Sequence, residues 1–266
     1  MDLDQVKQQS ASTWSSGDYA GLSEVLRPAA QALADACAVS AGQEVLDVAA
    51  GDGNFAFACA HEGASVVASD IAPGMVEKGR SRSQSEGYDI EWVEADAEDL
   101  PFDDHRFECV GSVFGAMIAP RPDVVSRELF RVVRPGNTVG MTAWTPQSAA
   151  KEMFQIGRNH APEPPQGPQL EEWGTEDTVR ERFGDLANSI EMERCTLPWA
   201  AESPEAFVDF MERTAPPQAT AKANMPPEAY AAMRGEMVEL ARRWAGGDES
   251  FSIDVEYLLI VARRRG

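Results

Sequence analysis

The chain has 266 residues, 43% of them hydrophobic and 25% charged, which is typical of a globular protein large enough for one α/β domain with insertions. A net charge of −21 argues against nucleic acid or an anionic membrane surface as a partner and favours a small or cationic substrate. The four cysteines lie far apart without metal-ligand spacing, and no signal peptide or membrane span is indicated. We therefore expect a cytoplasmic protein with reduced thiols and no metal.

The first forty residues are predicted to form a helical segment that covers a ligand. Residues 1–18 are polar and are expected to be irregular or weakly helical. From Tyr19 to Cys37 the apolar residues follow helical spacing, and Pro28 predicts two short helices rather than one. Tyr19 is expected to contact the ligand and is a candidate catalytic residue, although a tyrosine in the core or at its rim also fits this pattern.

The central motif is Val45-Leu46-Asp47-Val48-Ala49-Ala50-Gly51-Asp52-Gly53-Asn54-Phe55-Ala56. It predicts a strand, a tight glycine turn and a helix, an arrangement that places a ligand at the carboxyl end of a strand and the N-terminus of a helix. The spacing of Gly51, Gly53 and Ala56 also fits the dinucleotide fingerprint. The glycines alone therefore leave the choice of nucleotide-like ligand open.

Two carboxylates in the motif argue against a pyrophosphate. Asp47 stands before the turn and Asp52 lies between the glycines. Like charges ~4 Å apart cost on the order of a few kcal/mol at an effective dielectric near 20, which outweighs the attraction of a helix N-terminus for an anion. For a ligand with cationic groups the interaction with these carboxylates is attractive, and S-adenosylmethionine carries both an ammonium and a sulfonium.

A second predicted strand, residues 65–70, ends in Asp70. A carboxylate at this position can accept both ribose hydroxyls, although acids are also favoured at helix N-termini for electrostatic reasons. Ile71 and Met75 follow at the start of a polar helix and are candidate cofactor contacts.

A third predicted strand, residues 90–94, leads to Asp96 and Ala97. Asp96 is expected to accept the exocyclic amine of adenine while Ala97 packs on the ring. The carboxylates of Glu98 and Asp99 are expected to be solvated, and Glu98 is included with the candidate cofactor-binding residues.

Residues 107–115 predict a buried fourth strand, whose end would face the ligand through Ser112 and Phe114. A helix over 123–133, a turn at 134–136 and a fifth strand over 139–144 follow. Five strands that alternate with helices imply a parallel, doubly wound sheet.

The remaining residues predict a cap that could enclose a small acceptor. A short helix and a proline-rich run over 161–168 precede a helix at 175–183 and a sixth strand at 189–199. A helix begins after Ser203, a loop is expected at 216–217, and a longer helix and a seventh strand close the chain. His160 is a candidate for an optional general base, with an ordinary loop histidine as the alternative.

Four ordered motifs resemble class I S-adenosylmethionine-dependent methyltransferases, most closely the bacterial ubiquinone/menaquinone-biosynthesis-like and small-molecule enzymes. They are residues 45–54, Ser69-Asp70, residues 96–102 and residues 131–136. The resemblance implies an α/β Rossmann-like fold: a doubly wound seven-stranded sheet, mostly parallel with an antiparallel last strand, plus a helical cap. It also implies S-adenosylmethionine as cofactor and S-adenosylhomocysteine as product.

The resemblance assigns roles to individual residues. Asp47, Ala49, Gly51 and Gly53 would line the methionine end, Asp70 would bind the ribose, Met75 would lie by the adenine, and Asp96 and Ala97 would recognise its edge. Ala49 stands where the family usually has its first glycine, and Asp52 stands where a small hydroxyl residue or Cys is commoner. The cofactor is still expected to bind. The candidate cofactor-binding residues are Tyr19, Asp47, Ala49, Gly51, Asp52, Gly53, Asn54, Asp70, Ile71, Met75, Asp96, Ala97, Glu98, Ser112 and Phe114.

The expected organisation has four parts. Residues 1–40 cover the cofactor, 41–145 form the cofactor-binding core, 146–250 hold the substrate-defining cap with the sixth strand, and 251–266 form the last strand and a basic tail. The tail, Arg263-Arg264-Arg265, is expected to be frayed. In-line methyl transfer to a small molecule in a desolvated pocket is the expected activity, with O-, N- and C-methylation open. An NAD-dependent oxidoreductase and a non-catalytic S-adenosylmethionine-binding protein are the alternatives, and the protein could be a monomer or a homodimer.

Overall fold

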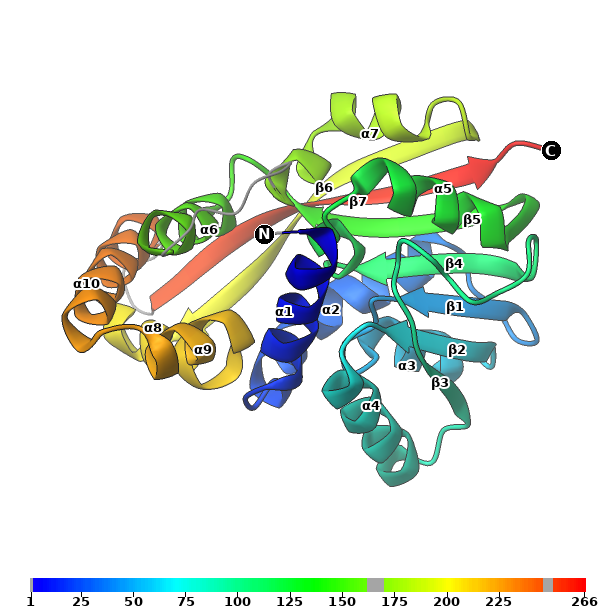
Figure 1. Ribbon diagram of the computed structural model, residues 1–266. Helices are drawn as coiled ribbons and strands as arrows, with labels where there is room; N and C mark the ends of the chain where they lie inside the picture. The colour runs from blue at the N-terminus through cyan, green and yellow to red at the C-terminus, as the bar shows by residue number, and fades with distance from the viewer. Residues whose placement is uncertain (1, 162–169, 246–250) are drawn as a thin grey trace.

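A seven-stranded sheet runs through the computed structural model, which describes residues 2–161, 170–245 and 251–266 (Figure 1). The strands are β1 (Glu44–Val48), β2 (Ser65–Asp70), β3 (Ile90–Glu94), β4 (Phe107–Val113), β5 (Val133–Trp144), β6 (Ala187–Ala201) and β7 (Phe251–Arg264). Their order is β3-β2-β1-β4-β5-β7-β6. Strands β1 to β5 pair in parallel, and β7 is antiparallel to both β5 and β6. The predicted fold class is confirmed.

Helices cover both faces of this sheet (Figure 1). Helices α2 (Ala20–Ala36), α3 (Asn54–His61) and α4 (Pro73–Glu86) lie on one face, while α5 (Pro122–Val132) and α7 (Glu176–Phe183) lie on the other. Small residues let α2 and α3 approach the strands closely. A Cβ at Gly140 of β5 would lie 2.4 Å from Cys37 Sγ, and one at Gly111 of β4 would lie 2.1 Å from the Phe55 ring.

The cap is built on the long β6–β7 ribbon, which extends beyond the other strands (Figure 1). Its helices are α6 (Ala149–His160), α8 (Pro204–Thr214), α9 (Pro216–Asn224) and α10 (Pro227–Trp244). Two short 3-10 helices, η1 (Ala116–Ile118) and η2 (Leu170–Gly174), follow β4 and precede α7. Helix α1 (Leu3–Ser15) lies between the cap and the core and contacts α4 and α9.

The N-terminal segment is more regular than predicted. Residues 3–15 form the full helix α1, begun by a capping box in which Asp2 and Gln5 exchange side-chain to backbone hydrogen bonds. Pro28 does not divide the next segment, because α2 is continuous from Ala20 to Ala36. Pro28 is exposed, so the Glu24 carbonyl that loses its helical partner faces water, while Leu26 and Leu33 remain buried on the sheet.

Three further expectations need correction. The loop expected at Pro216-Pro217 is the first turn of α9, a place where proline loses no helical hydrogen bond. The turn expected at 134–136 lies inside β5, which begins at Val133 and is irregular beside Phe107. The basic tail is not free, because Arg264 donates to the Arg131 carbonyl and Arg265 to the carbonyls of Ala187 and Gly184. The proline-rich run at 161–168 falls almost entirely outside the described residues.

The four cysteines are all free thiols, and Cys37, Cys59 and Cys109 are buried. Among the described helices, none combines the length and the apolar character needed to cross a membrane.

Substitution of Gly111 tests the close packing of α3 on β4. We expect Gly111→Ala to lower the free energy of unfolding by about 1 to 3 kcal/mol, because the new methyl group overlaps the buried Phe55 ring. Gly157→Ala in α6 is the matched control, since a Cβ there meets nothing within 4 Å. It should be neutral or stabilising by up to about 1 kcal/mol. Urea denaturation measures both, and equal stability of the two variants would contradict the packing.

Candidate functional site

The turn between β1 and α3 is held in a left-handed backbone conformation. Ala49, Gly51 and Gly53 have φ values of 52°, 58° and 97°. A Cβ at Gly53 would lie 2.7 Å from the buried Trp92 ring, so only glycine fits there. Ala49 adopts a region that favours glycine at a cost of about 1 kcal/mol, which explains both the usual glycine and the tolerated alanine.

Asp70 fastens this turn to the end of β2. Its Oδ2 accepts the Gly51 N–H at 2.8 Å and its Oδ1 accepts the Ala72 N–H, also at 2.8 Å. Burial raises its pKa to about 6, and the two N–H groups limit the increase. At neutral pH Asp70 is therefore a fixed, ionised acceptor with lone pairs left for a ligand.

Asp47 lies beneath the same turn and is almost fully buried. Its Oδ2 accepts the Ala56 N–H in the first turn of α3 at 2.9 Å, while its Oδ1 has no hydrogen-bond partner among the residues that the structure describes. Burial, followed by the nearby Asp70 and Asp52, raises the Asp47 pKa well above its usual value. An unpartnered buried carboxylate oxygen costs free energy unless a donor reaches it, so this site favours a cationic or hydrogen-bonding ligand.

Tyr19 covers the turn from the side of α2. A Cβ at Gly51 would lie 3.4 Å from its ring, and Trp14 packs against it edge-on at 6.0 Å between ring centroids. Burial and the carboxylates of Asp52, Asp70 and Asp47 raise the pKa of Tyr19. Its hydroxyl therefore stays protonated at neutral pH, where it can donate a hydrogen bond but does not act as a base.

Asp52 and Asn54 belong to a polar network between α2, the turn and α4. Ser23 Oγ lies 2.7 Å from Asp52 Oδ1, and Asn54 Nδ2 donates to the Ser23 carbonyl at 2.7 Å. Arg82 Nη1 donates to Asn54 Oδ1 at 3.0 Å and lies 3.7 Å from Asp52 Oδ1. Burial raises the Asp52 pKa, and these partners partly oppose the increase. Direct cofactor contact by Asp52 and Asn54 stays a prediction.

The loop after β3 brings Asp96, Ala97 and Glu98 to the same edge of the sheet. Asp96 Oδ1 accepts the Glu98 N–H at 2.9 Å, and Ala97 is buried. The expectation that Glu98 is solvated is wrong, because its side chain is fully buried and accepts the Arg121 N–H at 2.6 Å and Arg121 Nε at 2.7 Å. Lys7 contacts both carboxylates from α1.

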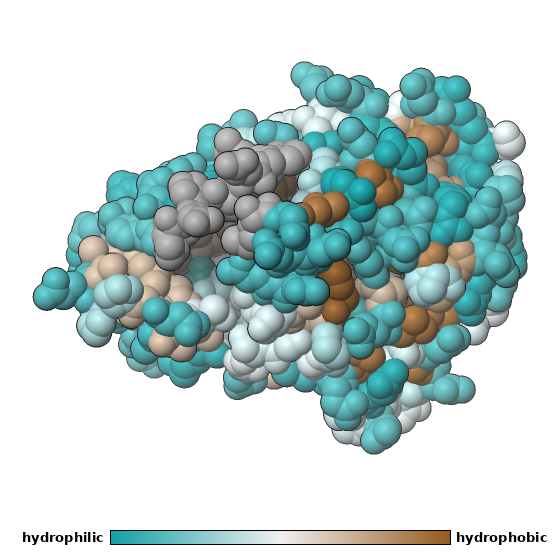
Figure 2. Space-filling model, in the orientation of Figure 1, coloured by the Kyte–Doolittle hydropathy of each residue, from teal (hydrophilic) through white to brown (hydrophobic). Residues whose placement is uncertain are grey.

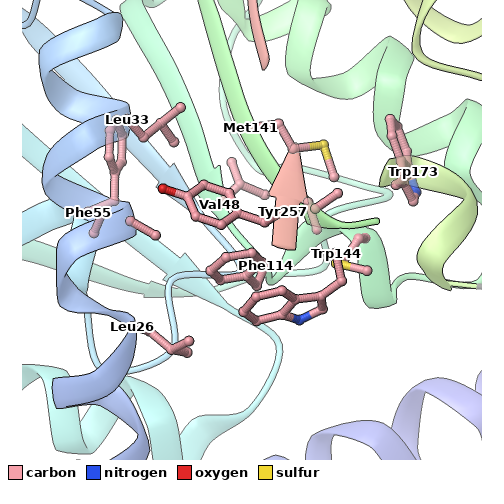
Figure 3. Packing of buried hydrophobic residues seen from close by; sticks show 14 of the residues in the cluster. Leu26, Leu33, Val48, Phe55, Phe114, Met141, Trp144, Trp173 and Tyr257 are labelled. Carbon is pink, nitrogen blue, oxygen red and sulfur yellow. The ribbon is translucent and has the colours of Figure 1, made fainter. Parts of the chain in front are cut away.

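Ser112 and Phe114 lie where β4 ends beside β1. Ser112 Oγ donates to the Val48 carbonyl at 2.7 Å and accepts the Ala116 N–H at 2.9 Å. The Phe114 ring stacks on Trp144 of β5, with centroids 3.8 Å apart and planes within 4° (Figure 3). These contacts tie the ends of three strands together and place an aromatic surface beside the turn.

The other candidates divide into two groups. Ile71 is half-buried directly after Asp70, and Met75 is buried in the first turn of α4, so both stay near the ribose candidate. The structure does not bring His160 to this cluster. Its Nε2 lies 2.9 Å from Glu236 Oε1 of α10, in the outer part of the cap (Figure 1).

Several residues around the turn carried no sequence motif. Ser23, Arg82 and Lys7 lie on helices remote in sequence from the turn, so only tertiary structure identifies them. Trp144 ends a predicted strand at the same edge of the sheet as Asp70 and Asp96, and that position could have indicated it. Among the residues that the structure describes, no cluster of three or more His, Cys, Asp or Glu side chains could hold a metal ion.

Comparison with known proteins agrees with this geometry. Residues 45–136 match the family model described as a methyltransferase domain. An uncharacterised protein of Mycobacterium tuberculosis, Rv1403c, is 33% identical over 256 residues, which cover 94% of this chain and 92% of the relative. Residues 45–136 are therefore a methyltransferase domain, and the whole chain belongs to one family with Rv1403c.

Other known proteins are similar to part or to most of this methyltransferase. Demethylmenaquinone methyltransferase of Clavibacter sepedonicus is 44% identical over 104 residues, which cover 39% of this chain and 42% of that protein. The Bacillus subtilis YcgJ structure has a TM-score of 0.64 at 18% identity and covers 89% of this chain and 98% of its own. A Haemonchus contortus phosphoethanolamine N-methyltransferase, solved with S-adenosylhomocysteine, has a TM-score of 0.54 at 19% identity, covering 90% of this chain and 53% of its own.

The raised pKa of Asp70 predicts a pH-dependent stability. Its value of about 6 in the folded methyltransferase exceeds the ordinary 3.8, so the folded state binds this proton more tightly than the unfolded chain. The contribution to stability is greatest below about pH 4 and is lost as pH rises through 6, by on the order of 3 kcal/mol in total.

Asp70→Asn removes this titration. The quantity to compare is the unfolding free energy of the wild type minus that of Asp70→Asn. We expect this difference to decrease as the pH rises from about 4 to about 6.5 and to be constant at higher pH. Urea denaturation across this range provides the measurement. A difference that does not change with pH would show that Asp70 titrates normally.

Proposed function

We propose that this methyltransferase transfers the methyl group of S-adenosylmethionine to a small-molecule acceptor. The observation that carries the proposal is the group of buried carboxylates around the glycine turn, in which one oxygen of Asp47 has no partner within the described part of the chain. This negative cluster favours the ammonium and sulfonium groups and opposes a pyrophosphate. Crystal structures of similar fold that contain S-adenosylhomocysteine support the same cofactor.

Each acid has a distinct proposed role. The free Oδ1 of Asp47 attracts the ammonium of the methionine end, directly or through a water molecule. Asp70, held by the N–H groups of Gly51 and Ala72, accepts the ribose hydroxyls. Asp96 accepts the adenine amine while Ala97 packs on the ring. Met75 contributes an apolar side chain beside it.

The chemical step requires little from an acid or a base. Bound S-adenosylmethionine supplies an electrophilic methyl group, and in-line transfer to a neutral acceptor disperses the positive charge of the sulfonium. The protein gains rate by orienting the acceptor and excluding water. Tyr19 closes the turn from one side, and its protonated hydroxyl can position the acceptor by donating a hydrogen bond.

The cap side of the site is aromatic, which supports a small organic acceptor. Trp144 contacts Trp199 of β6 at 5.8 Å between ring centroids, and Trp199 contacts Phe207 of α8 at 6.1 Å. Trp199 Nε1 is buried without a hydrogen-bond partner among the described residues. An acceptor with an apolar body and a hydrogen-bond-accepting atom would suit this surface.

Calorimetric titration tests the cofactor assignment. We expect the wild type to bind S-adenosylhomocysteine and not NAD, and we expect Asp70→Ala to weaken binding at least tenfold, or about 1.4 kcal/mol. Asp177→Ala, on the exposed surface of α7, should bind like the wild type. Binding of NAD in preference to S-adenosylhomocysteine would favour the oxidoreductase alternative. An assay in which the protein and S-adenosylmethionine are incubated with a panel of metabolites then distinguishes an enzyme, which releases S-adenosylhomocysteine, from a non-catalytic binding protein, which does not.

A further inference from the structure

Helix α1 lies over the edge of the sheet where the acidic candidates gather. At its C-terminal end Ser15 Oγ accepts the Gly74 N–H at 3.2 Å, and Ser16 Oγ lies 3.3 Å from Thr220 Oγ1 of α9. Trp14 contacts Tyr19, which covers Gly51, whose N–H binds Asp70. The end of α1 is therefore connected to the ribose candidate through two aromatic rings.

Apolar burial contributes little to holding α1 in place. None of its 13 residues is buried, and Val6 is 37% exposed. Figure 2 shows this face of the molecule as mostly hydrophilic, with hydrophobic residues in small separate groups. Since a helix of this length is marginal in water by itself, its polar contacts decide whether it stays on the core.

The strongest polar contact of α1 is made by Lys7. Its Nζ lies 2.5 Å from Asp96 Oδ2 and 2.5 Å from Glu98 Oε2. The Lys7 side chain is only 14% exposed. Partial burial lowers its pKa, but the two carboxylates outweigh that effect and raise it, so the ammonium stays charged. Arg121 fixes the position of Glu98, and the Glu98 N–H fixes that of Asp96.

We propose that Lys7, with Asp96 and Glu98, forms a latch that closes α1 over the adenine end of the cofactor site and limits the rate at which the cofactor leaves. The latch rests on the proposed function, because it assigns the adenine to Asp96. Helix α1 is fastened above Asp96 by Lys7 and is linked to the Asp70 region through Trp14 and Tyr19. Cofactor exchange therefore requires α1 to move, and that movement breaks both ion pairs of Lys7.

Dissociation kinetics test the latch. We compare S-adenosylhomocysteine release from the wild type, Lys7→Met and the matched control Lys151→Met, which removes the same charge from an exposed position of α6. Lys7→Met should raise the dissociation rate constant at least tenfold, and Lys7→Arg should restore most of the slow release. Lys151→Met should stay within twofold of the wild type. Equal release from Lys7→Met and the wild type overturns the latch.

Hydrogen exchange without ligand separates a latch from a direct effect of Lys7 on Asp96. In Lys7→Met the amides of residues 3–15 should lose protection, and so should the Gly74 N–H that donates to Ser15, while the amides of α4 beyond Gly74 exchange as in the wild type. Faster release with α1 still protected would mean that Lys7 acts only on Asp96, and the latch would be rejected. A wild type that does not bind S-adenosylhomocysteine rejects the proposed function instead, and the exchange of α1 still tests whether Lys7 holds the helix.

Discussion

The site depends on two carboxylates that are buried at the carboxyl ends of neighbouring parallel strands. Asp47 and Asp70 lie inside the protein, where an ionised group is costly unless donors surround it. The donors are backbone N–H groups of Gly51, Ala56 and Ala72, from the glycine turn and the starts of α3 and α4. Satisfying the acids therefore fixes the turn, and the Asp47 oxygen that has no partner among the described residues supports the proposed cationic ligand.

The glycine turn is enclosed from two sides by elements that differ in character. Helix α1 approaches it mainly through polar contacts, with Lys7 on Asp96 and Glu98. Helix α2 adds a polar contact of Ser23 with Asp52, although it packs on the sheet through buried apolar residues. The cap approaches through aromatic rings that begin at Trp144. A polar closure can open and close with cofactor exchange, whereas an aromatic surface suits the exclusion of water from the acceptor.

The similarities to known proteins differ in extent. The demethylmenaquinone methyltransferase matches 39% of this chain, whereas the Mycobacterium tuberculosis relative matches 94% of it. This difference is expected if one cofactor constrains the core while the cap varies with the acceptor. The aromatic residues Trp199 and Phe207 belong to the cap, and their rings lie 6.1 Å apart between centroids.

The sequence by itself determined the sheet, the glycine turn and the acids Asp47, Asp70 and Asp96, because strand periodicity, turn glycines and strand-end acids are local features. Tertiary structure decided what those acids contact. Glu98 looks solvated in sequence, yet Lys7, more than ninety residues away, helps to bury it, and Pro28 does not divide α2 because the sheet supports the helix on its other face. His160 is expected from the sequence to be a general base or a loop histidine, but it is the last residue of α6, and only the docking of α6 on α10 shows that it pairs with Glu236. Contacts between distant segments depend on the packing of whole elements, which no local pattern records.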